Sequence, residues 1–187
     1  NIGGIVGGNN GPILNSSTTG TINGGNFIGG LVGNNLNNGR VNHSFSSVNI
    51  YGGSYIGGLF GGTSYAKIDN SYATGNVNGA TSVGGFAGWF YYGTIENSYA
   101  SGNVNGNSNV GGLVGYNKGL GTYIDNSYAT GSVNGSNIVG GLVGLNFAFI
   151  DNSFSIGFVT GSSNTGGLVG SGGAGVTSSY WDNETSN

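Results

Sequence analysis

Polar residues alternate with small or apolar residues along much of the chain. In residues 71–78 one set is Ser71, Ala73, Gly75 and Val77, and the other is Tyr72, Thr74, Asn76 and Asn78. Successive side chains of a β-strand point to opposite faces, so the alternation predicts strands with the first set toward a core. Tyr72 belongs to the second set, and we expect it to face solvent with its Thr and Asn companions.

A second pattern, Gly-Gly followed by two apolar residues and another Gly, divides the chain into repeats. It begins at seven positions, 26 to 29 residues apart: Gly3, Gly29, Gly57, Gly84, Gly111, Gly140 and Gly166. A period of this size is typical of solenoids, in which each unit buries its apolar face against its neighbours. The repeats therefore predict columns of equivalent residues rather than a single pocket.

The intervals within a repeat are nearly constant. An apolar residue follows the glycine pattern, a second comes nine residues later, and the next repeat begins seven residues after that. Only the segment before the first apolar residue varies, from 5 to 8 residues. We therefore predict an all-β fold, a parallel β-solenoid of about seven coils with one variable surface loop per coil. It forms a single repeat domain over residues 1–187, a rod of roughly 35 Å at about 4.8 Å per coil.

Two columns predict corners of the coil. Ile68 and Val77 lie an odd number of residues apart, so both face the core only if the chain bends near Asn70. Asn tolerates a left-handed backbone, which predicts a repeated corner at Asn15, His43, Asn70, Asn97, Asn126, Asn152 and Ser178. A glycine column predicts a turn with positive φ at Gly24, Gly52, Gly79, Gly106, Gly135 and Gly161. The Gly-Gly pairs predict close approach of backbones.

Composition supports a β fold and excludes some functions. Glycine supplies 44 residues, and each glycine inside a helix costs about 1 kcal/mol. The aromatic content of 12% argues against disorder. A net charge of -3, with only three Lys and Arg residues, offers no footprint for nucleic acid. No apolar run approaches the ~20 residues that span a bilayer, and no signal peptide opens the chain, so we expect a mature product or a segment of a longer protein.

Catalytic chemistry has little material in this chain. Cysteine is absent and His43 is the one histidine, so zinc sites and Ser-His triads lack residues. We predict that the protein is not an enzyme. A carboxylate pair could serve glycoside hydrolysis, but that mechanism needs one acid made distinct by its surroundings and a sugar-binding cleft.

Four of the six acidic residues occupy one column on successive coils: Asp69, Glu96, Asp125 and Asp151. Like charges about 5 Å apart repel, and calcium, which favours carboxylate oxygens, could relieve that repulsion. This column is the candidate metal site, and calcium is the one candidate cofactor. The alternative is a solvated edge with Lys67 as a partial counter-charge, which the sparse ligation of one carboxylate per coil favours.

One further column is aromatic, and we call it the aromatic ribbon: Phe45, Tyr72, Tyr99, Tyr128, Phe154 and Tyr180. If exposed, it suits stacking on sugar rings or packing against the same ribbon of another molecule. The alternative is a ladder covered by the variable segment, which carries Trp89, Phe90, Tyr91 and Tyr92.

The two ends of the repeat array differ. Trp181 falls where earlier coils have Ala or Ser, so residues 176–187 are predicted to form a C-terminal cap if that ring points inward. The first coil carries no charge or bulky cover, and a bare sheet end invites pairing with more β structure.

Several of these sequences resemble a known family. Gly112-Leu113-Val114-Gly115 and Gly141-Leu142-Val143-Gly144 resemble the GLUG motif, and so do Asn-Ser-Tyr-Ala-Thr-Gly at Asn70 and at Asn126 and the ending Ser179-Tyr180-Trp181-Asp182. The resemblance implies a β-solenoid in a large bacterial surface or secreted protein, and hence an extracellular location. The repeat is not known as a catalytic unit. Ser17, Val48 and Ile156 depart from the pattern.

These observations together predict a non-catalytic extracellular structural element, a stalk or a subunit of a cell-surface fibre. Its expected partners are copies of itself or other surface proteins, with neither nucleic acid nor a membrane span involved. The alternative is a glycan-binding adhesin module that uses the aromatic ribbon.

Overall fold

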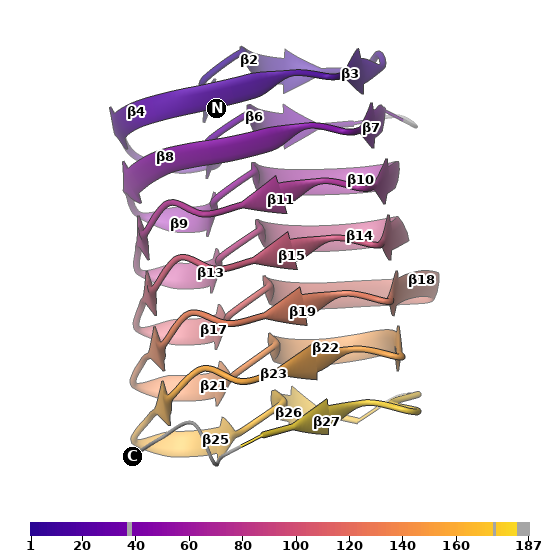
Figure 1. The fold of residues 1–187 in the computed structure, drawn as a ribbon. Coiled ribbons are helices and arrows are strands. Elements are labelled where there is room, and N and C mark those ends of the chain that lie inside the picture. The colour runs from indigo at the N-terminus through magenta and orange to yellow at the C-terminus, as the bar shows by residue number, and fades with distance from the viewer. Residues whose placement is uncertain (37–38, 174, 183–187) are drawn as a thin grey trace.

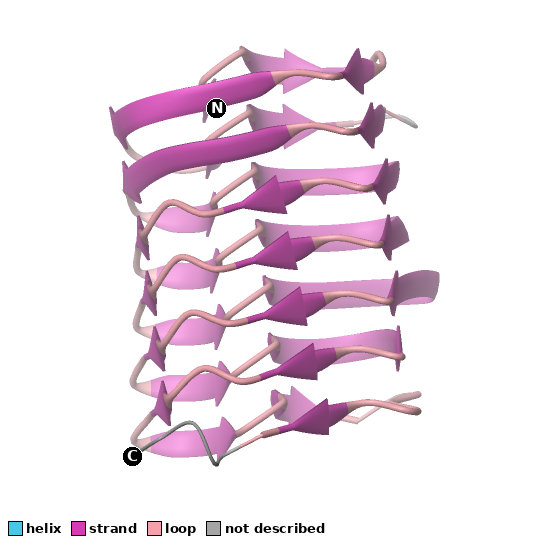
Figure 2. Cartoon of the chain, in the orientation of Figure 1, coloured by secondary structure: helices cyan, strands magenta, loops and turns pink. Residues whose placement is uncertain are grey.

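The computed structural model describes residues 1–36, 39–173 and 175–182, and every regular element in these ranges is a β-strand. Strands of successive coils lie one below another in three sheets, which we call A, B and C (Figures 1 and 2). Sheet A holds one strand from each of seven coils. The predicted fold class, a parallel β-solenoid of about seven coils, is confirmed.

Each coil visits the sheets in the order A, B, C. Sheet A consists of β1 (Ile2–Gly3), β5 (Ile28–Gly29), β9 (Ser54–Gly57), β13 (Thr81–Gly84), β17 (Ser108–Gly111), β21 (Asn137–Gly140) and β25 (Ser163–Gly166). Sheet B consists of β2 (Val6–Asn9), β6 (Val32–Asn35), β10 (Phe60–Asp69), β14 (Ala87–Glu96), β18 (Val114–Asp125), β22 (Val143–Asp151) and β26 (Val169–Gly172), with β3 (Ile13–Leu14) and β7 (Arg40–Asn42) beside the end of β10.

Sheet C is continuous in the first two coils and divided in later ones. The continuous strands are β4 (Ser17–Asn23) and β8 (Phe45–Tyr51). The divided ones are β11 (Tyr72–Ala73) with β12 (Val77–Asn78), β15 (Tyr99–Ala100) with β16 (Val104–Asn105), β19 (Tyr128–Ala129) with β20 (Val133–Asn134), and β23 (Phe154–Ser155) with β24 (Val159–Thr160); β27 (Tyr180–Trp181) ends the sheet. The division falls at a glycine such as Gly75, where a Cβ would stand 1.9 Å from the Val48 carbonyl oxygen.

The repeats stack in the register that the sequence columns predict. Val77 pairs with Val104, Tyr72 with Tyr99 and Gly57 with Gly84, all in parallel strands. The alternation is confirmed as well, since Ala73, Gly75 and Val77 are buried while Thr74 and Asn76 are exposed.

Two apolar clusters form the interior. The larger joins both apolar residues of the glycine pattern, such as Leu59 and Phe60, to the isoleucines at the end of sheet B and the alanines of sheet C. The smaller joins the Ile and Val residues of sheets A and C, such as Ile56 and Val77. Burial is nearly complete, so the coils are held from inside by stacked apolar side chains.

The Gly-Gly pairs lie where backbones of neighbouring coils meet. A Cβ on Gly57 would stand 2.7 Å from the Ala87 Cα and the Gly88 nitrogen of the next coil, and a Cβ on Gly85 would stand 2.1 Å from the carbonyl oxygen of Gly112. Real Cβ atoms do not approach backbone atoms so closely, so only glycine fits. The predicted close approach of backbones is confirmed.

The predicted corner is confirmed in all seven coils. Its residue has a left-handed backbone with φ between 45° and 50° in each: Asn15, His43, Asn70, Asn97, Asn126, Asn152 and Ser178. Asparagine adopts this conformation more readily than other residues with a Cβ, which explains its frequency here.

The predicted positive φ in the next glycine column is wrong. Gly24, Gly52, Gly79, Gly106, Gly135 and Gly161 have no positive φ, which occurs a few residues later at Phe27, Tyr55, Ser82, Asn109, Ile138 and Asn164. Packing requires the glycines instead. A Cβ on Gly52 would lie 2.7 Å from Cδ1 of both Ile28 and Ile56, so the core side chains of sheet A occupy that space.

The variable segment is not a loop in the third to sixth coils. It belongs to the long strands β10, β14, β18 and β22, which have 10, 10, 12 and 9 residues. Length differences are absorbed where the pairing register shifts, between Tyr91 and Thr94 and between Lys118 and Tyr123. The predicted surface loop is wrong for these coils, because an irregular strand keeps backbone hydrogen bonds that an open loop would lose.

Replacing a glycine at the coil contact should destabilise the protein. We expect Gly85→Ala to lower the free energy of unfolding by about 2–3 kcal/mol, because the new Cβ has no space beside the next backbone. Gly25→Ala is the matched control, since nothing lies within 4 Å of its Cβ position, and it should change stability by less than about 0.5 kcal/mol. Denaturant unfolding followed by circular dichroism measures both, and equal losses would contradict this account.

Candidate functional site

A ladder of serines runs along the corner. One serine follows the left-handed residue in each coil: Ser16, Ser44, Ser71, Ser98, Ser127, Ser153 and Ser179. The backbone N–H of each of the first six donates to the next serine's hydroxyl at 3.1 or 3.2 Å. Each hydroxyl in turn donates to the carbonyl two residues earlier, at 2.6–3.0 Å. The ladder satisfies the backbone where the chain leaves sheet B for sheet C.

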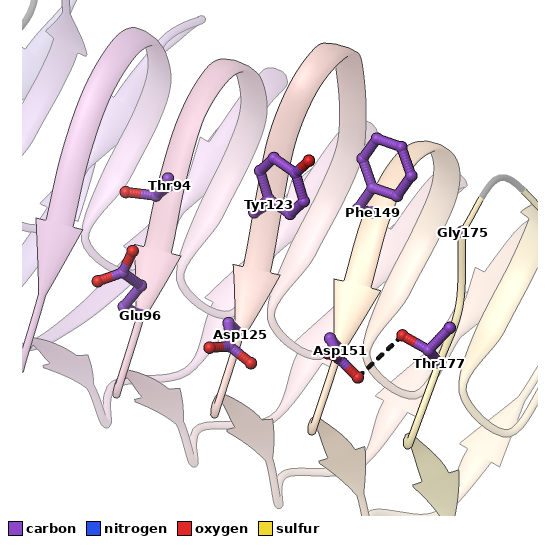
Figure 3. Close-up of a pocket in the computed structure, with 8 residues that line it drawn as sticks. All are labelled: Thr94, Glu96, Tyr123, Asp125, Phe149, Asp151, Gly175 and Thr177. Atoms are coloured by element: carbon purple, nitrogen blue, oxygen red, sulfur yellow. Dashed lines mark hydrogen bonds between the residues drawn. The ribbon is translucent and has the colours of Figure 1, made fainter.

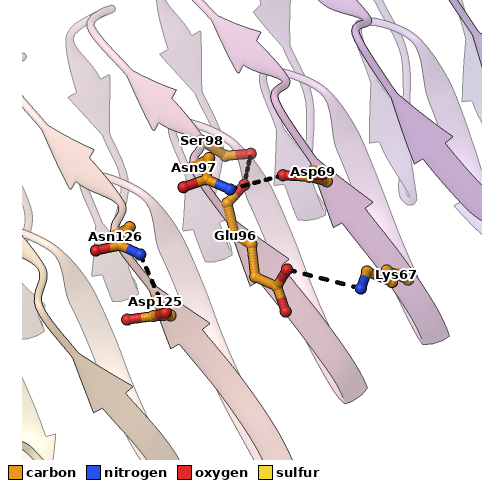
Figure 4. A network of polar contacts seen from close by, with 7 residues as sticks. All are labelled: Lys67, Asp69, Glu96, Asn97, Ser98, Asp125 and Asn126. Atoms are coloured by element: carbon orange, nitrogen blue, oxygen red, sulfur yellow. Dashed lines mark hydrogen bonds and ion pairs between the residues drawn. The ribbon is translucent and has the colours of Figure 1, made fainter.

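The four acidic residues form the predicted column beside this corner, with Asp69, Glu96, Asp125 and Asp151 paired in register. Corner asparagines donate to them: Asn97 Nδ2 lies 2.9 Å from Asp69 Oδ1, and Asn152 Nδ2 lies 3.1 Å from Asp125 Oδ1. Lys67 Nζ lies 3.7 Å from Glu96 Oε2 (Figure 4). Amide donors and one ammonium group therefore hold the carboxylates in place along the edge.

The acidic column does not converge on a point. Among residues 1–36, 39–173 and 175–182, no three His, Cys, Asp or Glu side chains are grouped closely enough to hold a metal ion. The carboxylates follow one another along the solenoid instead, one per coil (Figure 4). Calcium binding by this column therefore stays a prediction.

The aromatic ribbon is a stack of nearly parallel rings. Successive centroids from Phe45 to Tyr180 lie 4.8, 4.8, 5.0, 5.0 and 5.3 Å apart, and no interplanar angle exceeds 8°. Both faces of each inner ring are thus covered by the neighbouring rings. With its ring faces covered, the ribbon offers ring edges as contact surface; the residues from Phe45 to Phe154 are half-buried, and Tyr180 at the end is 58% exposed.

The rings of the variable segment contact a different group. Phe90 is fully buried in the core. Trp89, Tyr91 and Tyr92 instead belong to an outer aromatic cluster, connected by ring contacts of 4.3 to 6.4 Å: Phe27, Tyr55, Tyr65, Trp89, Tyr91 and Tyr92. The ring contacts of the described residues join none of this cluster to the aromatic ribbon.

Two tyrosines have raised pKa values. Burial raises the pKa of Tyr99, and the neighbouring phenols of Tyr72 and Tyr128 raise it further. In the outer aromatic cluster, a hydrogen bond with Tyr92 is the main cause that raises the pKa of Tyr91. Both shifts favour the neutral phenol, so both tyrosines remain hydrogen-bond donors well into the alkaline range.

A groove of about 390 Å³ lies along the end of sheet B, and three residues of the acidic column form part of its lining. Its upper row is Thr94, Tyr123, Phe149 and Gly175, and its lower row is Glu96, Asp125, Asp151 and Thr177 (Figure 3). The two rows come from β14, β18 and β22 and from residues 175–177 of the last coil, so each coil adds one residue to each row. The groove brings exposed rings and carboxylates to one face of the solenoid.

Trp181 occupies the inward column of sheet C, paired with the buried Ser155. Its ring lies against Gly167, where a Cβ would stand 1.9 Å from the indole, and its Nε1–H donates to the Gly157 carbonyl at 3.5 Å. Trp181 lies in the last coil, where no further coil covers it, and it remains 41% exposed. This geometry suits a cap, although residues 183–187 of the predicted cap 176–187 lie outside the described residues.

Two features were missed from the sequence. The serine ladder is visible as an invariant column, but serine reads there simply as a small inward residue. The groove was missed although Tyr123 and Phe149 share a column, in which each directly precedes the isoleucine of its coil, Ile124 or Ile150. The other members of that column differ in type, so no repeated residue marks it, yet the two rings stack with centroids 4.9 Å apart.

Stacked parallel coils joined by side-chain ladders define the class: this is a parallel β-solenoid repeat protein. Within that class, the family model described as "The GLUG motif" matches three consecutive segments, residues 52–78, 79–105 and 106–134. Residues 52–134 are therefore three consecutive GLUG repeats, and the resemblance found in the sequence is confirmed. Each match covers one full coil.

Neither the curated proteins nor the solved structures searched contain a significant match to this chain. Within the described part of the chain, no helix has the length and hydropathy needed to cross a bilayer.

Removing one serine hydroxyl tests the ladder. Ser98→Ala removes the acceptor of the Ser71 N–H and the donor to the Glu96 carbonyl, and should lower the unfolding free energy by about 1–3 kcal/mol. Ser101→Ala, at an exposed position of the same strand region, is the control and should stay within about 0.5 kcal/mol. Thermal and urea unfolding measure both; a neutral Ser98→Ala would show that the ladder is dispensable.

Stability should fall with rising pH in part through Tyr99. Its pKa is raised in the folded protein, so above the ordinary tyrosine pKa of about 10 the unfolded state loses its proton first. Below about pH 10 both states bind the same proton, so Tyr99 adds nothing to the pH dependence of stability. As the pH rises above that value, the melting temperature should decline. Tyr99→Phe should decline less steeply between about pH 9.5 and 11, and parallel curves for the two proteins would contradict the assigned shift.

Proposed function

We propose that this protein is a non-catalytic structural element outside the cell, a stalk or a subunit of a cell-surface fibre. One observation carries the proposal: the register of coil on coil continues without a break through sheet A, from β1 to β25. A repeat protein built this way resists bending because every coil is bonded to the next by backbone and side chain.

Side-chain hydrogen bonds between successive coils support the proposal of a rigid rod. Asn76 N–H donates to Asn49 Oδ1 at 3.0 Å and Asn103 N–H to Asn76 Oδ1 at 2.9 Å. With the serine ladder and the aromatic ribbon, this asparagine column ties each coil to its neighbours at several points around the section. Such redundancy suits a load-bearing element better than a site that must move.

The absence of a catalytic role is supported by the residues themselves. His43, the one histidine, is exposed at a corner position that asparagine fills in five other coils. The acidic column consists of carboxylates in similar surroundings, whereas acid–base chemistry needs two carboxyl groups with different environments. The proposed function is therefore non-catalytic.

The geometry of the aromatic ribbon favours protein contacts over the glycan-binding alternative. Sugars stack on the faces of aromatic rings, and here the inner ring faces are covered by neighbouring rings at 4.8–5.3 Å. A long row of ring edges and hydroxyls instead matches a second extended surface, such as another surface protein or another copy of this chain.

Electron microscopy of the purified protein tests the proposal. We expect filaments or lateral bundles at high protein concentration, because the ribbon offers the same contact along its whole length. The triple variant Tyr72→Ser, Tyr99→Ser, Tyr128→Ser should reduce them, while Tyr123→Ser, outside the ribbon, should not.

Two outcomes would contradict the proposed association. Particles that stay single at the highest soluble concentration would contradict the proposal that the protein is a fibre subunit. Glycan-array binding that is lost in the triple ribbon variant, and kept in Tyr123→Ser, would replace it with the adhesin module.

A further inference from the structure

The groove on sheet B joins two kinds of side chain that other parts of the surface keep separate. Its volume of about 390 Å³ falls within the 300–1,000 Å³ typical of small-ligand sites. Tyr123 and Phe149 form one wall, stacked at 4.9 Å and yet 45% and 39% exposed. Thr94 and Gly175 flank them in the same row, so no bulky side chain closes the ends of this wall (Figure 3).

The opposite row of the groove is anionic and held in place. Thr177 Oγ1 donates to Asp151 Oδ1 at 2.8 Å, and Asn126 Nδ2 donates to Asp125 Oδ2 at 3.2 Å. These donors orient the carboxylates without neutralising them. The ion pair of Lys67 lies on Glu96, and among the described residues neither aspartate is paired with a cationic side chain, so both carboxylates are available to a cationic ligand.

Ring wall and carboxylate row together specify the ligand. A metal ion would use the carboxylates and leave the rings unused, and a neutral sugar would donate hydroxyl hydrogen bonds to the carboxylates without compensating their charge. An organic ammonium ion uses both, since its methylene stem packs on the rings while its charged ends approach the carboxylates. Carboxylates on neighbouring coils, about 4.8 Å apart, also suit a chain that carries several ammonium groups.

We propose that this groove binds a flexible organic polycation of the polyamine class. The ligand lies along the solenoid axis, with its methylenes against Tyr123 and Phe149 and its ammonium groups beside Glu96, Asp125 and Asp151. The site lies beside the corner between sheets B and C and uses none of the ribbon rings. It goes beyond the proposed structural role and does not depend on it.

Isothermal titration of the whole chain with spermidine tests the proposal at low ionic strength. We expect saturable one-to-one binding that weakens as salt increases. Asp125→Asn and Asp151→Asn should each weaken binding by about tenfold or more. Asp69→Asn removes the same charge from the same column outside the groove lining, and should change the affinity less than about twofold.

A second matched pair of variants tests the contribution of the aromatic wall to binding. Phe149→Leu should weaken spermidine binding several-fold, whereas Phe147→Leu, at an exposed ring of the same strand that does not line the groove, should leave it unchanged. Circular dichroism and melting temperature of every variant separate lost binding from lost folding.

Each alternative has a distinct result. Calcium that binds with the same dependence on Asp125, while Phe149→Leu has no effect, would replace the polyamine site with a metal column. Neutral oligosaccharides that bind as well as spermidine would assign the groove to sugars. Equal losses in Asp69→Asn and Asp125→Asn would reduce the effect to unspecific attraction between opposite charges, and the proposal would fall.

Discussion

The distance between neighbouring coils is the constraint on which the rest of the structure depends. Parallel strands pair at about 4.8 Å, and at the corner between sheets A and B this spacing presses backbone against backbone. Gly57 and Gly85 lie at that contact, where a Cβ would collide with the backbone of the next coil. With larger residues there, the coils would separate, and hydrogen bonds, apolar clusters and surface ladders would be lost together.

The same spacing determines what the surface can offer. Each residue of a coil is placed beside its equivalent, so a ring meets a ring, an acid meets an acid and a serine N–H donates to the next serine hydroxyl. Aromatic stacking stabilises one such column, whereas the column of like charges needs donors from outside, which Asn97 and Asn152 supply. Repetition thus favours extended contact surfaces over compact sites.

Repeating features formed by residue types that favour them could be predicted from the sequence, and features imposed by packing could not. The period, the buried alternation, the left-handed corner at Asn70 and the stack at Tyr72 all follow from residues that recur at fixed intervals. The left-handed backbone at Tyr55 and Ile138 escaped prediction because tertiary packing imposes it on residues that do not favour it. Likewise, Tyr123 and Phe149 share a column directly before Ile124 and Ile150, but the other residues of that column differ in type, so the sequence does not indicate a groove there.

The equivalence of the coils has a consequence for how such a chain changes over generations. Residues 79–105 form one coil whose two flat sides match those of its neighbours, as the register from Val77 through Val104 to Val133 illustrates. Duplicating or deleting such a unit creates a junction that already exists elsewhere in the molecule. The length of the rod can therefore be altered in whole steps by recombination within the gene, without any new interface having to evolve.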